Sequence, residues 1–427
     1  MSPETLVSPA IASPQPAPET TPYNTAVFDD SVMKTYGRFP LALERGKGCR
    51  VWDTEGKEYL DFVAGIATCT LGHSHPALIE AVTDQVSKLQ HVSNLYYIPL
   101  QGELAGWLTA NSCGDRVFFC NSGAEANEGA IKLARKYGHT KLGIEGMPMI
   151  LTANASFHGR TLATVTATGQ PKYHKGFTPM VQGFDYVPYN DFPALKLKVE
   201  SLNAYGPRVA AILLEPLQGE GGVNPGNIEY FQQVRQLCDE TGILLMLDEV
   251  QVGMGRSGKL WGHENLGIEP DVFTLAKGLG GGFPIGAMLC KAKANVFQPG
   301  DHASTFGGNP FVCRVGMTVV QTIERENLLA NVQARGEQLR AGLAGLAAQY
   351  PQQLAGARGW GLINGLVLQP DGEKGAIDIV KAALEEGLLL VPAGPTVVRF
   401  VPPLVVSESE VEEAIALTAR ALAKVFG

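Results

Sequence analysis

Between about residues 115 and 290, short apolar runs alternate with segments whose apolar residues recur every three or four positions. Short apolar runs bounded by turn-forming residues are typical of buried strands, whereas the three-to-four spacing is typical of helices. The predicted strands are 116–120, 149–153, 209–214, 243–247, 272–276 and 285–290. A helix is predicted at 228–240, stopped by Gly242. This alternation favours an α/β fold with a mostly parallel sheet.

The two ends of the chain have a different pattern. Residues 41–62 contain short apolar strands around a turn, and residues 311–427 contain longer helices with few strands. The last helix is predicted to begin after Ser407, with Glu410 as its capping-box partner, and to run to about Phe426. We therefore expect the two ends to fold together as a smaller α+β domain.

This pattern divides the chain into four predicted parts. Residues 1–26 are rich in Pro, Ala, Ser and Thr, and are expected to be a disordered tail. The other predicted parts are the N-terminal half of the small domain at 27–84, a large domain at 85–317 and the C-terminal half of the small domain at 318–427.

Lys277 follows an apolar run and is followed at once by a glycine tract. The run predicts a buried strand, and the glycines allow a close backbone approach or a positive φ. A lysine placed in this way can lose its charge to burial and form a Schiff base with a carbonyl compound. A lysine that only extends from a strand end to solvent is the plain alternative for this segment alone.

Asp248 stands at the end of a second apolar run, 243–247, and is followed by Glu249. Ligand sites of open α/β sheets form beyond the carboxyl ends of the strands, so Asp248 is expected to face a ligand. A carboxylate buried there requires a cationic partner, and a protonated pyridine nitrogen would serve. Together, Lys277 and Asp248 are the two groups that pyridoxal 5'-phosphate (PLP) requires.

A third segment offers a site for the phosphate of such a cofactor. The predicted strand at 116–120 leads into a helix for which Ser122 is the expected N-cap and Glu125 its capping-box partner. Free N–H groups at Gly123 and Ala124 would bind phosphate without a basic side chain. A well-capped helix without a ligand is the alternative for this segment by itself.

From about Tyr36 to its C-terminus, the chain resembles the class-III, fold-type I PLP-dependent aminotransferases. Besides the Asp248 and Lys277 segments, the stretches that carry the resemblance are 35–40, 72–76, 121–126, 156–161, 215–222 and 302–310. Within the class, the chain is most similar to enzymes, those of cyanobacteria in particular, that act on N2-acetyl-L-ornithine in arginine biosynthesis. The resemblance implies a large domain with a mostly parallel seven-stranded sheet and a small domain built from both chain ends.

The resemblance also implies roles around the cofactor. Lys277 would be the catalytic Schiff-base lysine of a ping-pong reaction, and Asp248 would hold the proton of the ring nitrogen. Gln251 would contact the ring hydroxyl, with Val250 beneath the ring and Phe157 stacked on its other face. The remaining implied cofactor-binding residues are Ser122, Gly123, Ala124, Glu249 and Thr305. Thr305 would come from the neighbouring subunit, which implies a homodimer with shared active sites.

Substrate binding is implied for five further residues. Arg160 would hold a carboxylate of the substrate, and Arg399 a second one. Glu220 would shield Arg399 when the amino donor carries no second carboxylate, so that one site accepts both acetylornithine and glutamate. Glu215 and Ser304 would line the same pocket. For the charged residues among them, a purely structural ion pair is the alternative.

The substrate is less specifically indicated than the class. Ile66 falls where ornithine δ-aminotransferases carry a tyrosine, which favours acetylornithine, although enzymes for 4-aminobutyrate share the isoleucine. Succinylornithine stays open as a substrate. A glutamate-1-semialdehyde-type aminomutase is the alternative from another reaction class, and its relatives lack the patterns seen at 157–161 and 304–310.

Composition is consistent with this class of enzyme. The net charge of −8 and the charged fraction of 18% give no basic footprint for nucleic acid or a membrane surface. Seven unpatterned cysteines and no secretion signal favour the cytoplasm. The Gly253–Gly258 segment matches the dinucleotide fingerprint GxGxxG, but no helix is predicted after it. His73 and His75 are too sparse for a metal site, and none is expected.

Overall fold

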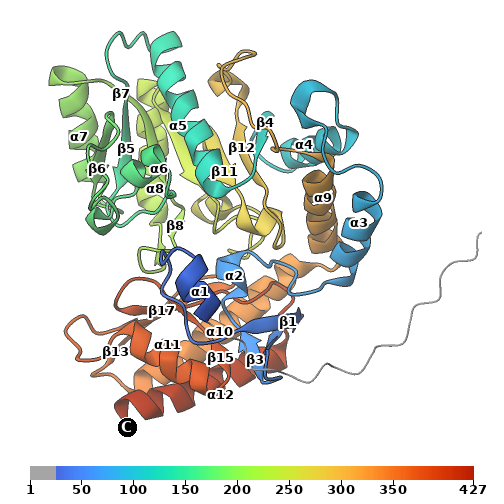
Figure 1. Cartoon of the computed structure of the whole chain (residues 1–427). Coiled ribbons are helices and arrows are strands. Elements are labelled where there is room, and N and C mark those ends of the chain that lie inside the picture. Colours follow the sequence, from blue (N-terminus) through green and yellow to red (C-terminus); the bar gives the residue numbers. More distant parts are fainter. Residues whose placement is uncertain (1–25) are drawn as a thin grey trace, which may run out of the picture.

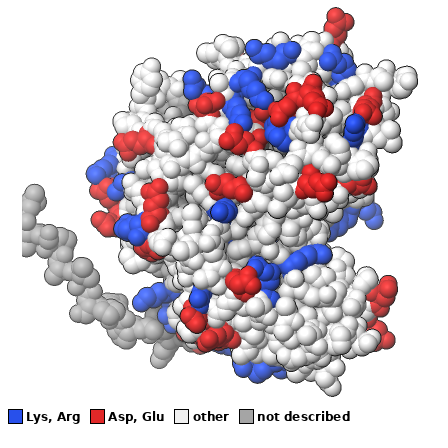
Figure 2. All heavy atoms as spheres, turned by 180° about the vertical axis from the view of Figure 1, so that it is seen from behind, with Lys and Arg blue, Asp and Glu red and all other residues white. Residues whose placement is uncertain are grey.

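The computed structural model describes residues 26–427, which form two lobes (Figure 1). The tail predicted at 1–26 lies outside the described residues except for Ala26, which begins α1 (Ala26–Ser31). The large lobe contains a seven-stranded sheet, and the small lobe contains two four-stranded sheets. Acidic and basic side chains are intermixed on the face of the molecule seen in Figure 2.

The seven-stranded sheet has the order β4-β12-β11-β10-β7-β5-β6. Its strands are β4 (Arg116–Cys120), β5 (Met149–Ala153), β6 (Phe184–Val187), β7 (Val209–Leu214), β10 (Leu244–Asp248), β11 (Val272–Leu275) and β12 (Gly286–Cys290). Only β12 is antiparallel to its neighbours β4 and β11, so the predicted mostly parallel sheet is confirmed. β10 lies at the centre, which places Asp248 at the middle of one sheet edge.

The central strands are apolar throughout because both faces of the sheet are covered. Along β10, Leu245 and Leu247 face the core that contains α8 (Ile228–Thr241), whereas Leu244 and Met246 face the core that contains α5 (Gly123–Thr140). α8 ends at Gly242 with φ 73°, a left-handed conformation that glycine adopts without strain, as the sequence predicted. α6 (Leu162–Ala167) and α7 (Phe192–Tyr205) also belong to this lobe.

Both chain ends build the small lobe, as the resemblance implied. One sheet has the order β1-β2-β3-β15 and the other the order β13-β14-β17-β16. In the first, Leu60 of β3 pairs with Leu388 of β15, which joins the two ends directly. The strands are β1 (Leu43–Lys47), β2 (Arg50–Asp53), β3 (Glu58–Asp61), β13 (Leu354–Trp360), β14 (Ile363–Leu368), β15 (Leu388–Leu389), β16 (Val391–Pro392) and β17 (Val397–Phe400).

Helices cover these sheets and connect the two lobes. α10 (Leu328–Gln349), α11 (Ala376–Glu385) and α12 (Glu408–Phe426) belong to the small lobe, and α2 (Ala64–Ala67) is a short turn of helix. α3 (Pro76–Val86) and α4 (Pro99–Ala110) pack on α9 (Pro310–Arg325). The capping box predicted for α12 is confirmed, because Ser407 and Glu410 bond each other's backbone N–H groups. The exact domain boundaries stay a prediction.

Candidate functional site

A cavity of about 460 Å³ opens at the carboxyl ends of the large-sheet strands. Residues from the ends of β10 and β11, from the start of α5, and from the segments after β5 and β7 line it. Segments that are far apart in sequence therefore meet at the sheet edge where ligands of α/β proteins bind. The small lobe contacts the cavity wall through Arg399, which bonds the lining residues Glu220 and Gln251.

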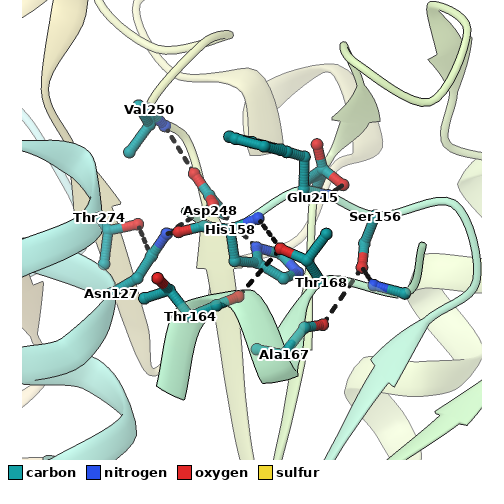
Figure 3. Close-up of polar contacts among 12 residues, drawn as sticks. Asn127, Ser156, His158, Thr164, Ala167, Thr168, Glu215, Asp248, Val250 and Thr274 are labelled. Atoms are coloured by element: carbon teal, nitrogen blue, oxygen red, sulfur yellow. Dashed lines mark hydrogen bonds and ion pairs between the residues drawn. The ribbon is translucent and has the colours of Figure 1, made fainter. Parts of the chain in front are cut away.

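Asp248 is held in a fixed orientation by three donors (Figure 3). One carboxylate oxygen accepts from the Val250 N–H at 3.0 Å. The other accepts from Asn127 Nδ2 at 2.7 Å and is 2.9 Å from His158 Nδ1. Asp248 is only 5% exposed, so these bonds replace the water it has lost. The side chain can therefore present a charge of fixed position to a cation in the cavity.

The supporting residues Asn127 and His158 were not predicted. Asn127 lies on the buried face of α5, and its Oδ1 accepts from Thr274 Oγ1 at 2.7 Å. His158 donates its backbone N–H to Thr168 Oγ1 at 2.9 Å. For Asn127, the sequence offered one signal, a polar residue on an otherwise apolar face of the helix. Its partner could not be read from the sequence, because Asn127 meets Asp248 from 121 residues away.

Lys277 lies two residues after β11 and has φ 36°, which is a strained conformation for a residue with a side chain. The neighbouring Gly278 is required, because a Cβ there would come within 3.0 Å of Thr70 Oγ1 and 3.1 Å of Met254 Cβ. Burial lowers the pKa of the Lys277 amine below its ordinary value, although Glu220 opposes this shift. A neutral, nucleophilic amine is therefore accessible at this position.

The N-terminus of α5 lines one part of the cavity. Ser122 accepts from the Glu125 N–H at 3.2 Å, which confirms the predicted N-cap. Within the described part of the chain, the N–H groups of Gly123 and Ala124 have no acceptor and remain available to an anion. A Cβ at Gly123 would lie 2.7 Å from a Val250 methyl, so the glycine lets these two segments meet.

The capping box predicted for α5 is wrong in one respect. The Glu125 carboxylate does not return to Ser122. It accepts from the backbone N–H and from Nδ2 of Asn121, both at 2.8 Å. Asn121 offers two donors where Ser122 would offer one, which explains the preference.

Phe157 and Arg160, from the segment after β5, also line the cavity. The Arg160 guanidinium stacks over Tyr173 at 4.0 Å and lies 5.5 Å from the Phe157 ring centroid. Its side chain is exposed and forms no ion pair with any residue in the described range 26–427. Stacking restricts the side chain and leaves its donors free, which suits the binding of a carboxylate.

Arg399, on β17, is fully buried and is paired with Glu220 at 2.5 Å. The same nitrogen donates to Gln251 Oε1 at 2.8 Å. Among the described residues, its Nε and second Nη have no hydrogen-bond partner, so the guanidinium can accommodate another anion. Burial tends to raise the pKa of Glu220, but Arg399 and Lys277 outweigh it and hold this pKa below its ordinary value.

Glu215 is the second carboxylate of the cavity wall. Its Oε2 accepts from the Phe157 N–H at 3.1 Å. Burial, and then the charge of Asp248, raise the pKa of Glu215 well above its ordinary value. Glu215 forms no ion pair within the described residues, so burial favours the protonated form of this carboxyl group.

Three predicted site residues lie elsewhere. The Glu249 carboxylate points away from the cavity and bonds the N–H groups of Gly262 and His263, which corrects its assignment to the cofactor. Ser304 Oγ bonds Asn121 Nδ2 at 3.2 Å, outside the cavity wall. Thr305 is exposed on the surface. A strand-end carboxylate pair cannot both face one edge, because successive side chains alternate.

The remaining sequence features have structural roles. The Gly253–Gly258 segment forms turns, and no α-helix follows it, as expected. His75 caps α3 by accepting from the Ala77 N–H. No cluster of three metal-ligating side chains occurs in residues 26–427. None of the helices described there is long and apolar enough to cross a membrane.

Comparisons with known proteins place this cavity in context. The family model described as aminotransferase class-III matches residues 31–422. The acetylornithine aminotransferase of a Nostoc species is 68% identical over 426 residues, covering 100% of both chains. The acetylornithine aminotransferase of Thermosynechococcus vestitus is 67% identical and covers 97% of this chain and 99% of its own.

Solved structures are similar as well. The ornithine aminotransferase of Toxoplasma gondii has a TM-score of 0.89 at 32% identity, covering 94% of each chain. The N-acetylornithine aminotransferase of Stenotrophomonas maltophilia has a TM-score of 0.80 at 38% identity, covering 94% of this chain and 99% of its own. A second structure of the Toxoplasma enzyme has PLP at its active site in partial occupancy.

The depressed pKa of Lys277 can be tested in the cofactor-free protein. Only a neutral amine reacts with an acylating or reductively methylating reagent, so Lys277 should label at pH values where ordinary surface lysines, of pKa about 10.4, are protonated. Labelling should be lost as the pH falls through the lowered pKa. Mass spectrometry of peptides labelled over a pH series measures this, with the exposed lysines as internal controls. A Lys277 profile that coincides with theirs would contradict the prediction.

Proposed function

The chain belongs to the class-III aminotransferases, and on that premise we propose that it acts on N2-acetyl-L-ornithine. It transfers the terminal amino group to 2-oxoglutarate, giving N-acetyl-L-glutamate 5-semialdehyde and L-glutamate, a step of arginine biosynthesis. Relatives of 68% and 67% identity that carry this activity in their names support the substrate. The observation that carries the proposal is the buried Arg399–Glu220 pair, which suits a site with two alternating substrates.

PLP is the cofactor, and the residues of the cavity fit it. Bound PLP supplies an aldehyde that exchanges amino groups and a protonated ring that withdraws electrons. The unpaired N–H groups of Gly123 and Ala124 suit its phosphate, and Asp248 suits its ring nitrogen. Lys277 would bind the aldehyde, while Val250 and Phe157 would flank the ring.

Lys277 and Asp248 have complementary tasks in proton movement. The Lys277 amine, once free, accepts the proton of the substrate carbon that bears the amino group, and its lowered pKa keeps it neutral for that task. Asp248 would hold the ring-nitrogen proton in place, because its three hydrogen-bond partners fix the orientation of the carboxylate. Removal of water from the cavity strengthens both interactions.

The two arginines divide the recognition of substrates. Acetylornithine carries one carboxylate and glutamate carries two. The unpaired Arg160 is available to bind one carboxylate of either donor. Glutamate also carries a second carboxylate, which can replace Glu220 on Arg399. Acetylornithine has no carboxylate beside its reacting terminal amine, so Glu220 stays on Arg399 and no charge is left buried alone. Glu215 lines the same wall and, when protonated, can donate to the substrate.

The assembly and the location belong to the same proposal. We infer a cytoplasmic homodimer in which Thr305 of one subunit completes the phosphate site of the other. The exposure of Thr305 and of the adjacent Phe306, which is 58% exposed, supports a contact surface there. Ser304 would reach substrate from the same segment. The domain boundaries after residues 84 and 317 are proposed to separate the large domain from the two halves of the small domain.

Substitutions at Arg399 and Glu220 test the proposed recognition. Arg399→Ala should slow the glutamate half-reaction more than the acetylornithine half-reaction, because only glutamate offers the second carboxylate. The lost contact is worth roughly 2–5 kcal/mol. Glu220→Ala should have the opposite preference, and Arg160→Ala should damage both half-reactions. Single-turnover absorbance measurements report each half-reaction separately.

The same measurements with ornithine, succinylornithine and 4-aminobutyrate as amino donors decide the substrate. Acetylornithine should have the highest specificity constant, and turnover should require an external 2-oxo acid. A higher constant for another donor would contradict the substrate, and turnover without a 2-oxo acid would indicate an aminomutase. Equal losses in both half-reactions of Arg399→Ala would contradict the two-arginine scheme.

Asp248→Asn should slow both half-reactions by roughly a thousandfold, because the shape is retained but the charge that holds the ring proton is lost. Cofactor affinity should fall less. Rapid kinetics and equilibrium binding of PLP measure the two effects. Asp239→Asn, on the exposed face of α8, is the matched control and should behave as the unaltered enzyme. Near-normal rates for Asp248→Asn would mean that the ring nitrogen is paired with another group.

Subunit sharing can be tested with mixed dimers. Thr305→Asp should repel the phosphate, and Lys277→Ala should remove the amine, so each homodimer should be inactive. If Thr305 acts on the partner's site, a mixed dimer contains one intact site. Random pairing should then restore about a quarter of the sites. No recovery upon co-expression of the two variants would contradict a shared site.

A further inference from the structure

Three residues of the small lobe form one row across the sheet β13-β14-β17. Arg358 of β13 lies opposite Gly365 of β14, and Gly365 lies opposite Arg399 of β17. Residues directly opposite each other in an antiparallel sheet are on the same face. Arg358 and Arg399 therefore share a face and are separated by a residue without a side chain.

The loop that carries Glu220 lies across this row. It connects the short strands β8 (Leu217–Gln218) and β9 (Asn224–Pro225), and Figure 1 shows β8 at the boundary between the lobes. Glu220 pairs with Arg399 at one end of the row. In the middle, a Cβ added to Gly365 would come within 3.1 Å of Val223 Cβ, so the loop packs directly onto the glycine.

Arg358 binds the other end of the loop through its backbone. Its Nε donates to the carbonyl oxygens of Gly222 and Val223 at 3.2 and 3.0 Å, and one Nη donates to Gly222 at 2.8 Å. Burial lowers the pKa of the guanidinium below its ordinary value. No carboxylate pairs with Arg358 in residues 26–427. The hydrogen bonds of Arg358 therefore hold this loop in position.

The loop is held from the opposite side as well. A Cβ at Gly221 would lie 2.2 Å from the carbonyl oxygen of Ala155, which follows β5 of the large lobe. Gly222 has φ 121°, a conformation that disfavours any side chain. Because the backbone on either side is so confined, a small displacement at Gly222 would move Glu220 relative to Arg399.

We propose that Arg358 is a positioning residue that sets the choice between the two amino donors by holding Glu220 on Arg399. The inference rests on the proposed function, in which Glu220 shields Arg399 from every donor except glutamate. Since one sheet carries Arg399 and the residue that holds the Glu220 loop, the shield and the group it covers move as a unit. Without Arg358, Glu220 covers Arg399 less of the time, and the acetylornithine half-reaction suffers more than the glutamate half-reaction.

Arg358→Met tests the proposal in single-turnover measurements of the two half-reactions. The ratio of the acetylornithine to the glutamate specificity constant should fall about tenfold, as expected for loss of charged hydrogen bonds to a single loop. In a Glu220→Ala background the same substitution should leave the ratio unchanged, because the shield is already absent. Arg208→Met removes a guanidinium that bonds only the Leu142 carbonyl and is the matched control, with no change in the ratio.

Two further variants keep the proposal testable if Arg358→Met does not fold. Arg358→Lys keeps a donor near the carbonyls and should lower the ratio by less than Arg358→Met does. Gly365→Ala keeps Arg358 but pushes on Val223, as well as on a methyl of Val397 at 2.7 Å, and should lower the ratio in the same direction. Equal losses in both half-reactions for these variants, or a ratio that falls equally in the Glu220→Ala background, would overturn the proposal.

The outcomes also separate this inference from the proposed function. If Glu220→Ala and Arg399→Ala themselves leave the ratio unchanged, the two-arginine scheme is wrong and Arg358 has no shield to position. If both shift the ratio as expected while the Arg358 and Gly365 variants do not, the proposed function stands and the positioning role of Arg358 is excluded.

Discussion

A buried guanidinium with only one carboxylate is the constraint on which this site depends. Arg399 is completely shielded from water, and an unpaired charge in that position would be strongly destabilising. Glu220 compensates it and remains partly exposed to the cavity, so the pair can open without exposing a hydrophobic core. In the proposed function, the same desolvation that makes the pair necessary would make its exchange for a substrate carboxylate selective. The lowered pKa of Lys277 follows from the same exclusion of water.

The sequence predicted the parts of the site that depend on a single segment. Lys277, Asp248 and the start of α5 each follow an apolar strand, and strand ends of a parallel sheet meet at one edge. The strand order itself and the antiparallel β12 were not predicted from the residues, because pairing between distant strands leaves no local pattern. The resemblance to a family supplied the roles of Arg160 and Arg399, which periodicity alone could not.

The residues that act by contacting a distant segment were not predicted from the sequence. Asn127 is an ordinary polar residue in a helix until the fold brings it to Asp248. Arg358 looks like a surface arginine of an edge strand. Its guanidinium nevertheless donates to the backbone of a loop more than a hundred residues earlier in the chain. Glu249 shows the reverse case. Its sequence position beside Asp248 suggested the cofactor, and the alternation of side chains along the strand directs it to His263 instead.

The parallel pair between β3 and β15 also bears on the order in which the chain can fold. β1, β2 and β3 pair with one another, but the outer edge of β3 acquires its neighbour only when residues 388 and 389 have left the ribosome. The seven-stranded sheet ends at residue 290, so it can assemble much earlier during synthesis. The nascent chain therefore carries one edge of β3 unpaired through most of translation. Arg399, which lies beyond β15, is among the last groups to reach the site, so Glu220 lacks its cationic partner until the chain is nearly complete.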